Sequence, residues 1–217
     1  KRNPKLCDLL FHNAYTNIAP SHYLLVEFEK AGYTNLQYIP NTIAIENYMY
    51  RQRSVIKPKL LWVRAFAEIY NPKMAVAVFQ KIKASYPEAE LCMVGPDKDG
   101  SGSITQAYAQ TLGLKIRFTG RLSKEEWTTL ANDYDIFINT THFDNTPVSV
   151  MEAMALGLPV VSTNVGGIPY LLEHQENALL VTDGNVDEMV QYISPSALEV
   201  TMYPSGVKKK VNYVFFP

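Results

Sequence analysis

The sequence predicts an α/β fold built on a doubly wound parallel sheet, and three observations support this class. From residue 58 onward, short apolar runs alternate with segments of helical periodicity. Turn residues such as Gly113 and Gly157 separate these segments. The chain has 217 residues, 47% of them hydrophobic and 19% charged, which is enough to bury a substantial core. Strands that alternate with helices require right-handed crossovers, so we expect helices on both faces of the sheet.

The first three strands and helices follow from local signals. The strands are expected at 60–63, 91–94 and 116–119, and the helices at 72–85, 103–112 and from 123 onward. Pro72 stands near a helix start, where proline is favoured, and Gly113 is a typical helix stop. Ser123 and Glu126, three residues apart, predict a capping box.

The second half repeats the pattern. The strands are expected at 135–139, 159–162 and 178–181, and the helices at 147–156, 168–174 and 185–193. Pro147 precedes one helix, and Gly157 with Pro159 ends it sharply. The whole order is Rossmann-like, and in such folds ligands bind at the carboxyl ends of the strands.

Four segments make up the chain. Residues 1–40 form one α/β unit, with strands at 15–18 and 36–39 and a helix at 21–31 capped by Ser21. Residues 41–57 form a linker, and its residues Tyr48, Tyr50, Arg51 and Arg53 are expected to dock on either neighbour. Residues 58–193 form the main domain, and the sequence assigns no structure to the tail 194–217. The chain does not begin with Met, which predicts a piece of a longer protein.

Charge and cysteine usage exclude several classes. The net charge of −1 argues against a nucleic-acid partner. Cys7 and Cys92 lie in apolar stretches and are predicted to be small buried hydrophobic residues, with neither a disulfide nor a metal site. The default location is therefore the cytoplasm. The run Lys208–Lys210 leaves a peripheral membrane contact open, although a solvated patch is the commoner reason for three lysines.

One motif imitates a metal site. Residues 97–104 resemble the opening of a calcium-binding loop. The twelfth position, where such loops have a bidentate glutamate, is Tyr108, and the preceding element is a strand rather than a helix. We therefore predict a polar turn and no metal.

The segment 143–169 carries the expected chemistry. A strand delivers the chain to a polar loop that contains His142, Asn145 and Thr146, and Pro147 and Val148 then begin a helix. The free N–H groups of a first helical turn, together with the helix dipole, favour an anion such as a phosphate.

Two carboxylates flank this helix start. Asp144 precedes the helix, and Glu152 lies about two turns inside it. Carboxylates accept hydrogen bonds from vicinal hydroxyls of a ribose or hexose. The turn at Gly166 and Gly167 allows a second close approach of backbone to ligand. A diphosphate site between two hydroxyl-binding acids describes a site for a sugar nucleotide.

This stretch resembles the donor-site signature of the family-4 retaining glycosyltransferases, which have the GT-B fold of two Rossmann-like domains. The family pattern is an acid, seven residues, a glutamate, then Ala-x-Ala-x-Gly-x-Pro-Val-Val and a Gly-Gly turn. The matching residues are Glu152, Ala153, Ala155, Gly157, Pro159, Val160, Val161, Gly166 and Gly167, with Asp144 as the first acid. The resemblance covers roughly residues 13–193.

The resemblance implies roles for single residues. Glu152 would bind the ribose hydroxyls, and Asp144, where glutamate is commoner, would contact the donor sugar. Arg64 matches an arginine that contacts the donor phosphates. The family lysine five residues later is absent, since Ile69 stands there, and Lys73 is the substitute in the next turn. The turn around Gly120, Arg121 and Leu122 resembles the base-recognition turn.

The resemblance also implies the organisation of the whole protein. Residues 1–40 would be a remnant of an amino-terminal acceptor domain, and 58–193 the donor domain. The expected partners are a nucleotide-sugar donor and a glycan or lipid-linked acceptor held by the missing domain, with no cofactor and no metal. The alternatives are an inactive sugar-nucleotide-binding module and a sugar-nucleotide epimerase of the same fold.

Overall fold

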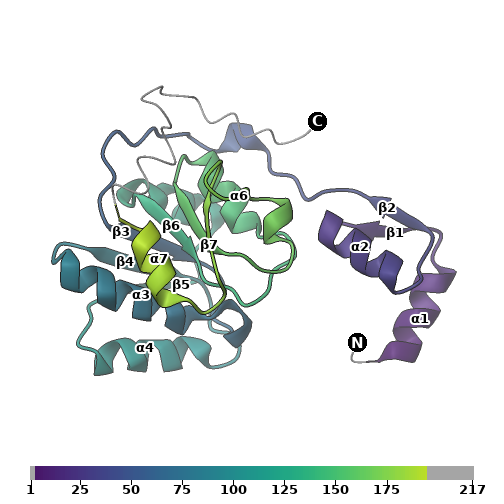
Figure 1. Ribbon diagram of the computed structural model, residues 1–217, viewed down its shortest axis with the longest axis horizontal. Helices are drawn as coiled ribbons and strands as arrows, with labels where there is room; N and C mark the ends of the chain where they lie inside the picture. The colour runs from purple at the N-terminus through teal and green to yellow at the C-terminus, as the bar shows by residue number, and fades with distance from the viewer. Residues whose placement is uncertain (1–2, 195–217) are drawn as a thin grey trace.

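The structure, a computed structural model, describes residues 3–194, and its main feature is a six-stranded parallel sheet (Figure 1). The strands are β3 (Lys59–Val63), β4 (Glu90–Val94), β5 (Arg117–Gly120), β6 (Ile136–Asn139), β7 (Val160–Thr163) and β8 (Leu179–Val181). Their spatial order is β5-β4-β3-β6-β7-β8, and every neighbouring pair is parallel. The predicted doubly wound sheet is confirmed.

Helices cover both faces of this sheet (Figure 1). The α-helices of this domain are α3 (Pro72–Ser85), α4 (Ser101–Thr111), α5 (Lys124–Leu130), α6 (Val148–Ala155) and α7 (Val186–Tyr192). The short 3₁₀ helices are η1 (Ile45–Asn47), η2 (Glu68–Tyr70), η3 (Ala131–Asp133) and η4 (Ile168–Tyr170). The helices at 72–85, 103–112, 147–156 and 185–193 are thus found within two residues of their expected bounds.

Side chains that alternate along each strand form a separate hydrophobic core on each face of the sheet. On β3, Leu60 and Trp62 pack with α3, α4 and α7, whereas Leu61 between them packs with α5 and α6. All three side chains are at most 1% exposed. Successive side chains of a strand point to opposite faces, and a strand covered on both faces must therefore be apolar throughout.

Local signals define the helix ends. Ser123 and Glu126 form the predicted capping box: the hydroxyl of Ser123 accepts from the Glu126 N–H, and the Glu126 carboxylate accepts from the Ser123 N–H. Asn71, at φ 46°, caps α3 from a left-handed conformation, which asparagine tolerates better than most residues. Pro72 follows as the first helical residue, as predicted.

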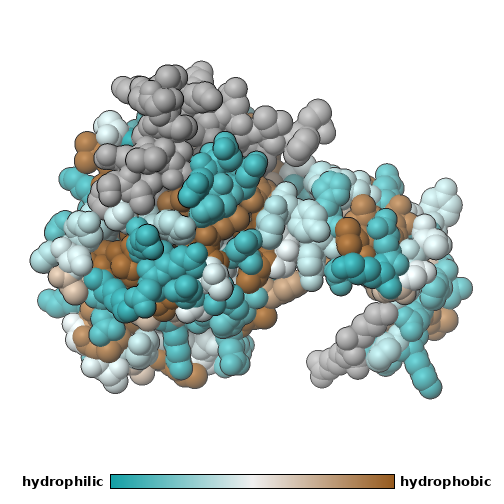
Figure 2. Space-filling model, viewed as in Figure 1, coloured by the Kyte–Doolittle hydropathy of each residue, from teal (hydrophilic) through white to brown (hydrophobic). Residues whose placement is uncertain are grey.

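The amino-terminal unit is a two-stranded parallel sheet with two helices. Its elements are α1 (Pro4–Asn13), β1 (Asn17–Ala19), α2 (His22–Lys30) and β2 (Leu36–Tyr38). The expected strands and the helix capped by Ser21 are present, but the sequence analysis missed α1, which Asn3 caps. Figure 2 shows this unit as a smaller lobe joined to the larger one along part of its side.

The segment between β2 and β3 docks on the larger domain. The guanidinium of Arg53 is buried and donates to the carbonyl oxygens of Tyr134, Leu156, Ala131 and Arg51 at 3.0–3.2 Å. A guanidinium carries five N–H donors in a fixed fork, which suits several carbonyl acceptors at once. The predicted docking of the linker is therefore found, through Arg53, on the larger domain.

Three expectations need correction or fall outside the structure. The helix expected at 168–174 is only the 3₁₀ turn η4, because His174 forms a β-bridge with Ala178 and Gln175 adopts a left-handed conformation, neither of which continues a helix. Cys7 is half-buried on α1 rather than buried, whereas Cys92 is buried as predicted. The tail 195–217 lies outside the described residues. Within 3–194, no helix is long and apolar enough to cross a membrane.

Candidate functional site

The candidate site lies at the point in the sheet where the order of strand addition reverses. Chain order runs outward from β3 through β4 on one side and from β6 on the other, so β3 and β6 flank the topological switch point. Ligands of open α/β sheets bind at this point, beyond the carboxyl ends of the strands. Arg64 follows β3, and the loop from His142 to Thr146 follows β6.

Arg64 and Asp144 form an ion pair across the switch point. The Asp144 side chain is 8% exposed and that of Arg64 20%. The guanidinium also lies 4.4 Å from the ring centre of Tyr70, and burial lowers the pKa of Arg64 below its usual value. Nε of Arg64 is buried with no hydrogen-bond partner in the described chain. The pair therefore holds a buried cationic donor at the edge where a ligand is expected.

The second acid, Glu152, is also paired. Its Oε1 accepts a 2.7 Å hydrogen bond from the hydroxyl of Tyr48 and lies 2.8 Å from Nζ of Lys124. The Glu152 side chain is 6% exposed, whereas that of Lys124 is 54% exposed. The hydrogen bond to Glu152 raises the pKa of Lys124, and burial raises that of Tyr48. Glu152 is thus buried in a polar setting that opens to solvent through Lys124, rather than in the apolar core.

The glycine turn packs directly on the Asp144 loop. The N–H of Gly167 donates a 2.8 Å hydrogen bond to the carbonyl oxygen of Asp144. A Cβ atom at Gly167 would lie 1.8 Å from the carbonyl oxygen of Asn145. Only glycine permits this approach, so the two loops predicted to face the ligand are held against one another.

The start of α6 has free donors. Pro147 is the N-cap residue and makes no side-chain cap. The N–H groups of Val148 and Ser149 find no acceptor within residues 3–194. These orphan donors and the positive end of the helix dipole match the predicted anion site.

His142 belongs to the loop between β6 and α6, and its ring contacts a residue that follows the edge strand β8. Its Nδ1 lies 2.8 and 3.0 Å from the two carboxylate oxygens of Asp183, which follows β8. Its backbone N–H donates to the carbonyl oxygen of Ile69. The Asp183 contact was not predicted.

The remaining predicted residues lie around this centre with fewer contacts. Lys73 is exposed at the start of α3, and its side chain has no ionic or hydrogen-bond partner in the described chain. Gly120 ends β5 at φ 70°, with its carbonyl oxygen accepting from the N–H of Gly95. Arg121 is exposed, and Leu122 is half-buried against the core.

The amino-terminal unit contacts the Asp144 loop. The hydroxyl of Ser21 is hydrogen-bonded to Asn145, and Thr146 Oγ1 lies 3.5 Å from the carbonyl oxygen of Pro20. The ring of Tyr23 meets that of Phe143 edge-on, with centroids 5.5 Å apart. The start of α2 therefore covers part of the site.

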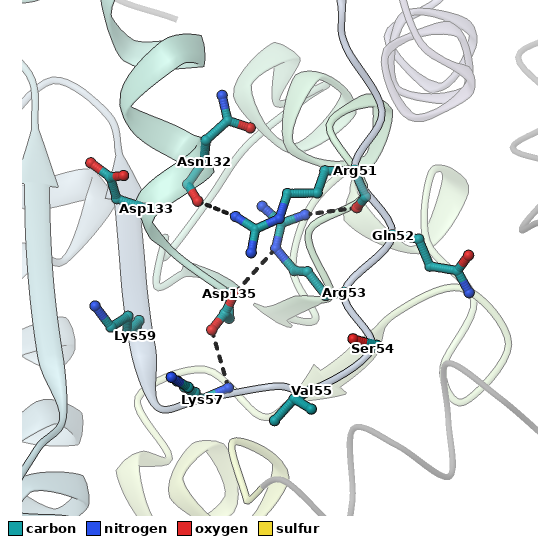
Figure 3. Close-up of a pocket in the computed structure, with 10 residues that line it drawn as sticks. All are labelled: Arg51, Gln52, Arg53, Ser54, Val55, Lys57, Lys59, Asn132, Asp133 and Asp135. Carbon is teal, nitrogen blue, oxygen red and sulfur yellow. Dashed lines mark hydrogen bonds and ion pairs between the residues drawn. The ribbon is translucent and has the colours of Figure 1, made fainter.

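A cavity of about 440 Å³ lies elsewhere. Figure 3 shows its lining residues, among them Arg51, Lys57, Lys59 and Asp135. Lys59 begins β3 and Asp135 precedes β6, so this cavity is at the amino ends of the strands, opposite the predicted site. Inside it, Asp135 pairs with Arg53 and accepts from the Lys57 N–H. These contacts fix the linker, and we assign the cavity no part in the candidate site.

The fold and the switch-point site define a Rossmann-like α/β domain of the type found in GT-B glycosyltransferases. Residues 50–196 match the family described as glycosyl transferases group 1, and the chain belongs to that family. The Anabaena HepE protein in complex with UDP and glucose superimposes with a TM-score of 0.77 at 21% identity, over 87% of this chain and 55% of that one.

Curated relatives match parts of the chain. An uncharacterised glycosyltransferase of Haemophilus influenzae is 30% identical over 52% of this chain and 32% of its own length. The N-acetyl-α-D-glucosaminyl L-malate synthase of Bacillus anthracis is 23% identical over 85% of this chain and 51% of its own. The chain therefore spans about a third to a half of these relatives.

Sequence reasoning missed the partners of the predicted residues. Tyr48 was noted only as a linker residue, and Lys124 and Asp183 were not considered. Tyr48 lies 104 residues from Glu152 and Asp183 lies 41 residues from His142. The one available signal was the position of Asp183, two residues after a predicted strand, since such residues lie at the ligand edge of the sheet.

Proposed function

We propose that this chain is the donor-binding part of a retaining, family-4 glycosyltransferase and that it binds a nucleotide-diphosphate sugar. The observation that carries the proposal is the joint placement of Arg64, Asp144 and Glu152. The first two meet at the topological switch point, and Glu152 lies on the helix that starts beside them. Solved structures of the same fold that contain UDP or UDP-glucose support the choice of ligand.

Each group has a task in this proposal. The diphosphate lies at the start of α6, where Val148 and Ser149 offer free N–H groups and Arg64 offers a half-buried guanidinium with a buried Nε. Glu152 accepts from the ribose hydroxyls, and Asp144 accepts from a hydroxyl of the donor sugar. Preorganised donors stabilise the negative charge that develops on the leaving diphosphate, and the donor phosphate itself receives the acceptor's proton.

The proposal assigns transfer to the longer protein. Residues 1–40 supply one part of the acceptor domain, and the glycan or lipid-linked acceptor binds to the rest of that domain. The 217-residue chain is therefore expected to bind the donor and to show negligible transfer.

A second candidate function is a sugar-nucleotide-binding module without activity. The ion pair favours it, because Asp144 neutralises the Arg64 charge that a leaving diphosphate would use. Turnover or slow donor hydrolysis by the longer protein would separate an enzyme from such a module.

Calorimetry on the 217-residue chain tests the proposal. We expect binding of UDP, with GDP and ADP as alternatives, and no binding of any of the three at millimolar concentration would refute it. Glu152→Ala is expected to weaken UDP binding more than Asp144→Ala does, because ribose contacts do not depend on the sugar. The reverse order would mean that the roles of the two acids are exchanged. Circular dichroism of each variant provides the folding control.

A further inference from the structure

The ring of His142 is oriented by a carboxylate at the carboxyl edge of the sheet. Both oxygens of Asp183 lie within 3.0 Å of Nδ1. The side chain of His142 is 43% exposed and that of Asp183 39% exposed, so the pair sits at the surface of the site rather than in the core. Since Nδ1–H donates to Asp183, Nε2 is the ring nitrogen left for a ligand.

The backbone places His142 in the same loop as Asp144. His142 lies two residues before Asp144, in the loop that leads to α6. Its N–H and the hydroxyl of Thr141 both donate to the carbonyl oxygen of Ile69, at 2.8 and 3.1 Å. Ile69 belongs to η2, the turn that follows Arg64, so His142 is tied to both segments that meet at the switch point.

The charge of the diphosphate requires a positively charged group in addition to the Arg64–Asp144 pair. The diphosphate of a sugar nucleotide carries two negative charges, and Asp144 already neutralises the positive charge of Arg64. A phosphate oxygen at Nε2 requires an N–H there. Because Nδ1–H is already donated to Asp183, the ring that serves both partners is the imidazolium, which places a positive charge opposite the phosphate.

We propose that His142 donates a hydrogen bond from Nε2 to the donor diphosphate and that Asp183 is the residue that positions it. The inference rests on the proposed function and identifies a phosphate contact within it. Asp183 is the titratable group in contact with the ring in the described chain, and Asp144, which pairs with Arg64, is the charged residue that shares the loop with His142.

The first test compares ligands with and without the diphosphate. Calorimetry with UDP and with uridine is carried out on the 217-residue chain and on its variants. We expect His142→Ala to weaken UDP binding about tenfold or more and uridine binding less than twofold, a loss typical of one charge-assisted hydrogen bond. His142→Lys is expected to restore UDP affinity to within about twofold of the original chain. His12→Gln on α1, a remote exposed histidine, is the matched control and is expected to change neither.

The second test measures how UDP-glucose binding depends on pH. Binding of UDP-glucose is measured at pH 6 and pH 8, because its diphosphate does not titrate in this interval whereas histidine does. We expect tighter binding at pH 6 for the original chain, no such difference for His142→Ala, and a reduced difference for Asp183→Asn. In the His142→Lys background, Asp183→Asn is expected to cost no affinity, because a lysine needs no tautomer to be fixed.

The outcomes separate a failure of the proposed donor binding from a failure of the proposed His142 contact. If the original chain binds none of the three diphosphates, the proposed function fails. If it binds UDP and His142→Ala binds equally well, or loses uridine to the same degree, the inference fails and the proposed function stands. An equal pH difference in the original chain and in His142→Ala would also overturn the inference.

Discussion

The hydroxyl of Tyr48 donates a 2.7 Å hydrogen bond to Oε1 of Glu152 and so joins the segment before β3 to helix α6. Both residues are buried, at 7% and 5% exposure of the whole residue. A buried carboxylate needs hydrogen-bond partners, and here one comes from the linker and one from Lys124. The linker therefore contributes directly to the orientation of the acid proposed to bind ribose.

Tyr48→Phe removes this hydrogen bond and keeps the ring. We expect the free energy of unfolding to fall by about 1–2 kcal/mol, because the buried oxygen of Glu152 loses a donor. UDP affinity should fall several-fold, since the carboxylate is no longer fixed. Urea unfolding and calorimetry measure the two effects.

The matched control for this substitution is Tyr15→Phe. Tyr15 is fully exposed, at 100%, and its hydroxyl should contribute nothing to either measurement. If Tyr48→Phe behaves like Tyr15→Phe in both, Glu152 is held by other contacts and the linker has no part in the site.

Asp144→Asn releases Arg64 from its ion pair. The folded chain should become less stable by about 1–3 kcal/mol, because a largely buried guanidinium loses its counter-ion. The freed charge should in turn favour a phosphate. We therefore expect UDP to raise the melting temperature of Asp144→Asn by more than it raises that of the original chain. Asp187→Asn, which breaks an exposed pair with Lys81, is the control and should show the original shift. A smaller shift in Asp144→Asn would mean that Arg64 does not reach the diphosphate.

The elements that sequence reasoning predicted well are those specified by nearby residues. The capping box at Ser123 and the helix start at Pro72 depend on residues within one turn, and both are found as predicted. The strands β3, β4, β6, β7 and β8 follow from apolar runs that are buried on both faces, whereas the edge strand β5 is partly exposed. The helix α1 was missed because its apolar residues remain largely exposed, Leu9 and Leu10 at 61% each, and so give a weak burial pattern.

The sequence predicted the single residues of the site but not the contacts between them. Arg64, Asp144 and Glu152 were identified from the family pattern, whereas their contacts depend on the order of strands in space. Arg64 meets Asp144 only because β3 and β6 are neighbours at the switch point. Lys124 reaches Glu152 because α5 and α6 lie on the same face of the sheet. Local sequence carries no signal for such contacts.

Gly167→Ala tests whether the glycine turn holds the Asp144 loop in place. The backbone of Gly167 has an ordinary φ of −85°, so the cost of alanine is steric: its Cβ would lie 1.8 Å from the carbonyl oxygen of Asn145. We expect the loop to shift, stability to fall by about 1–3 kcal/mol and UDP affinity to fall at least tenfold.

Gly113→Ala is the comparison for this substitution. Gly113 has a positive φ of 66° and open space around its Cβ position, far from the loop. It should lose about 1–2 kcal/mol of stability without any loss of UDP affinity. Equal effects of the two substitutions on UDP affinity would show that the contact between Gly167 and Asn145 has no role in binding.

Alkaline pH should destabilise the chain through Tyr134. This side chain is 3% exposed, and burial, followed by the hydrogen bond with Cys92, raises its pKa to about 12. The unfolded chain releases the phenolic proton near pH 10, whereas the folded chain keeps it, so stability is fully present below pH 10 and is lost as the pH approaches 12. We expect Tyr134→Phe to remove about 1–2 kcal/mol of the loss seen in urea unfolding between pH 10 and pH 11.5. Tyr48 and Lys124, whose pKa values are also raised, would still contribute to the remaining decline. An unchanged pH slope in Tyr134→Phe, with Tyr15→Phe as the control, would show that the buried phenol does not govern the alkaline transition.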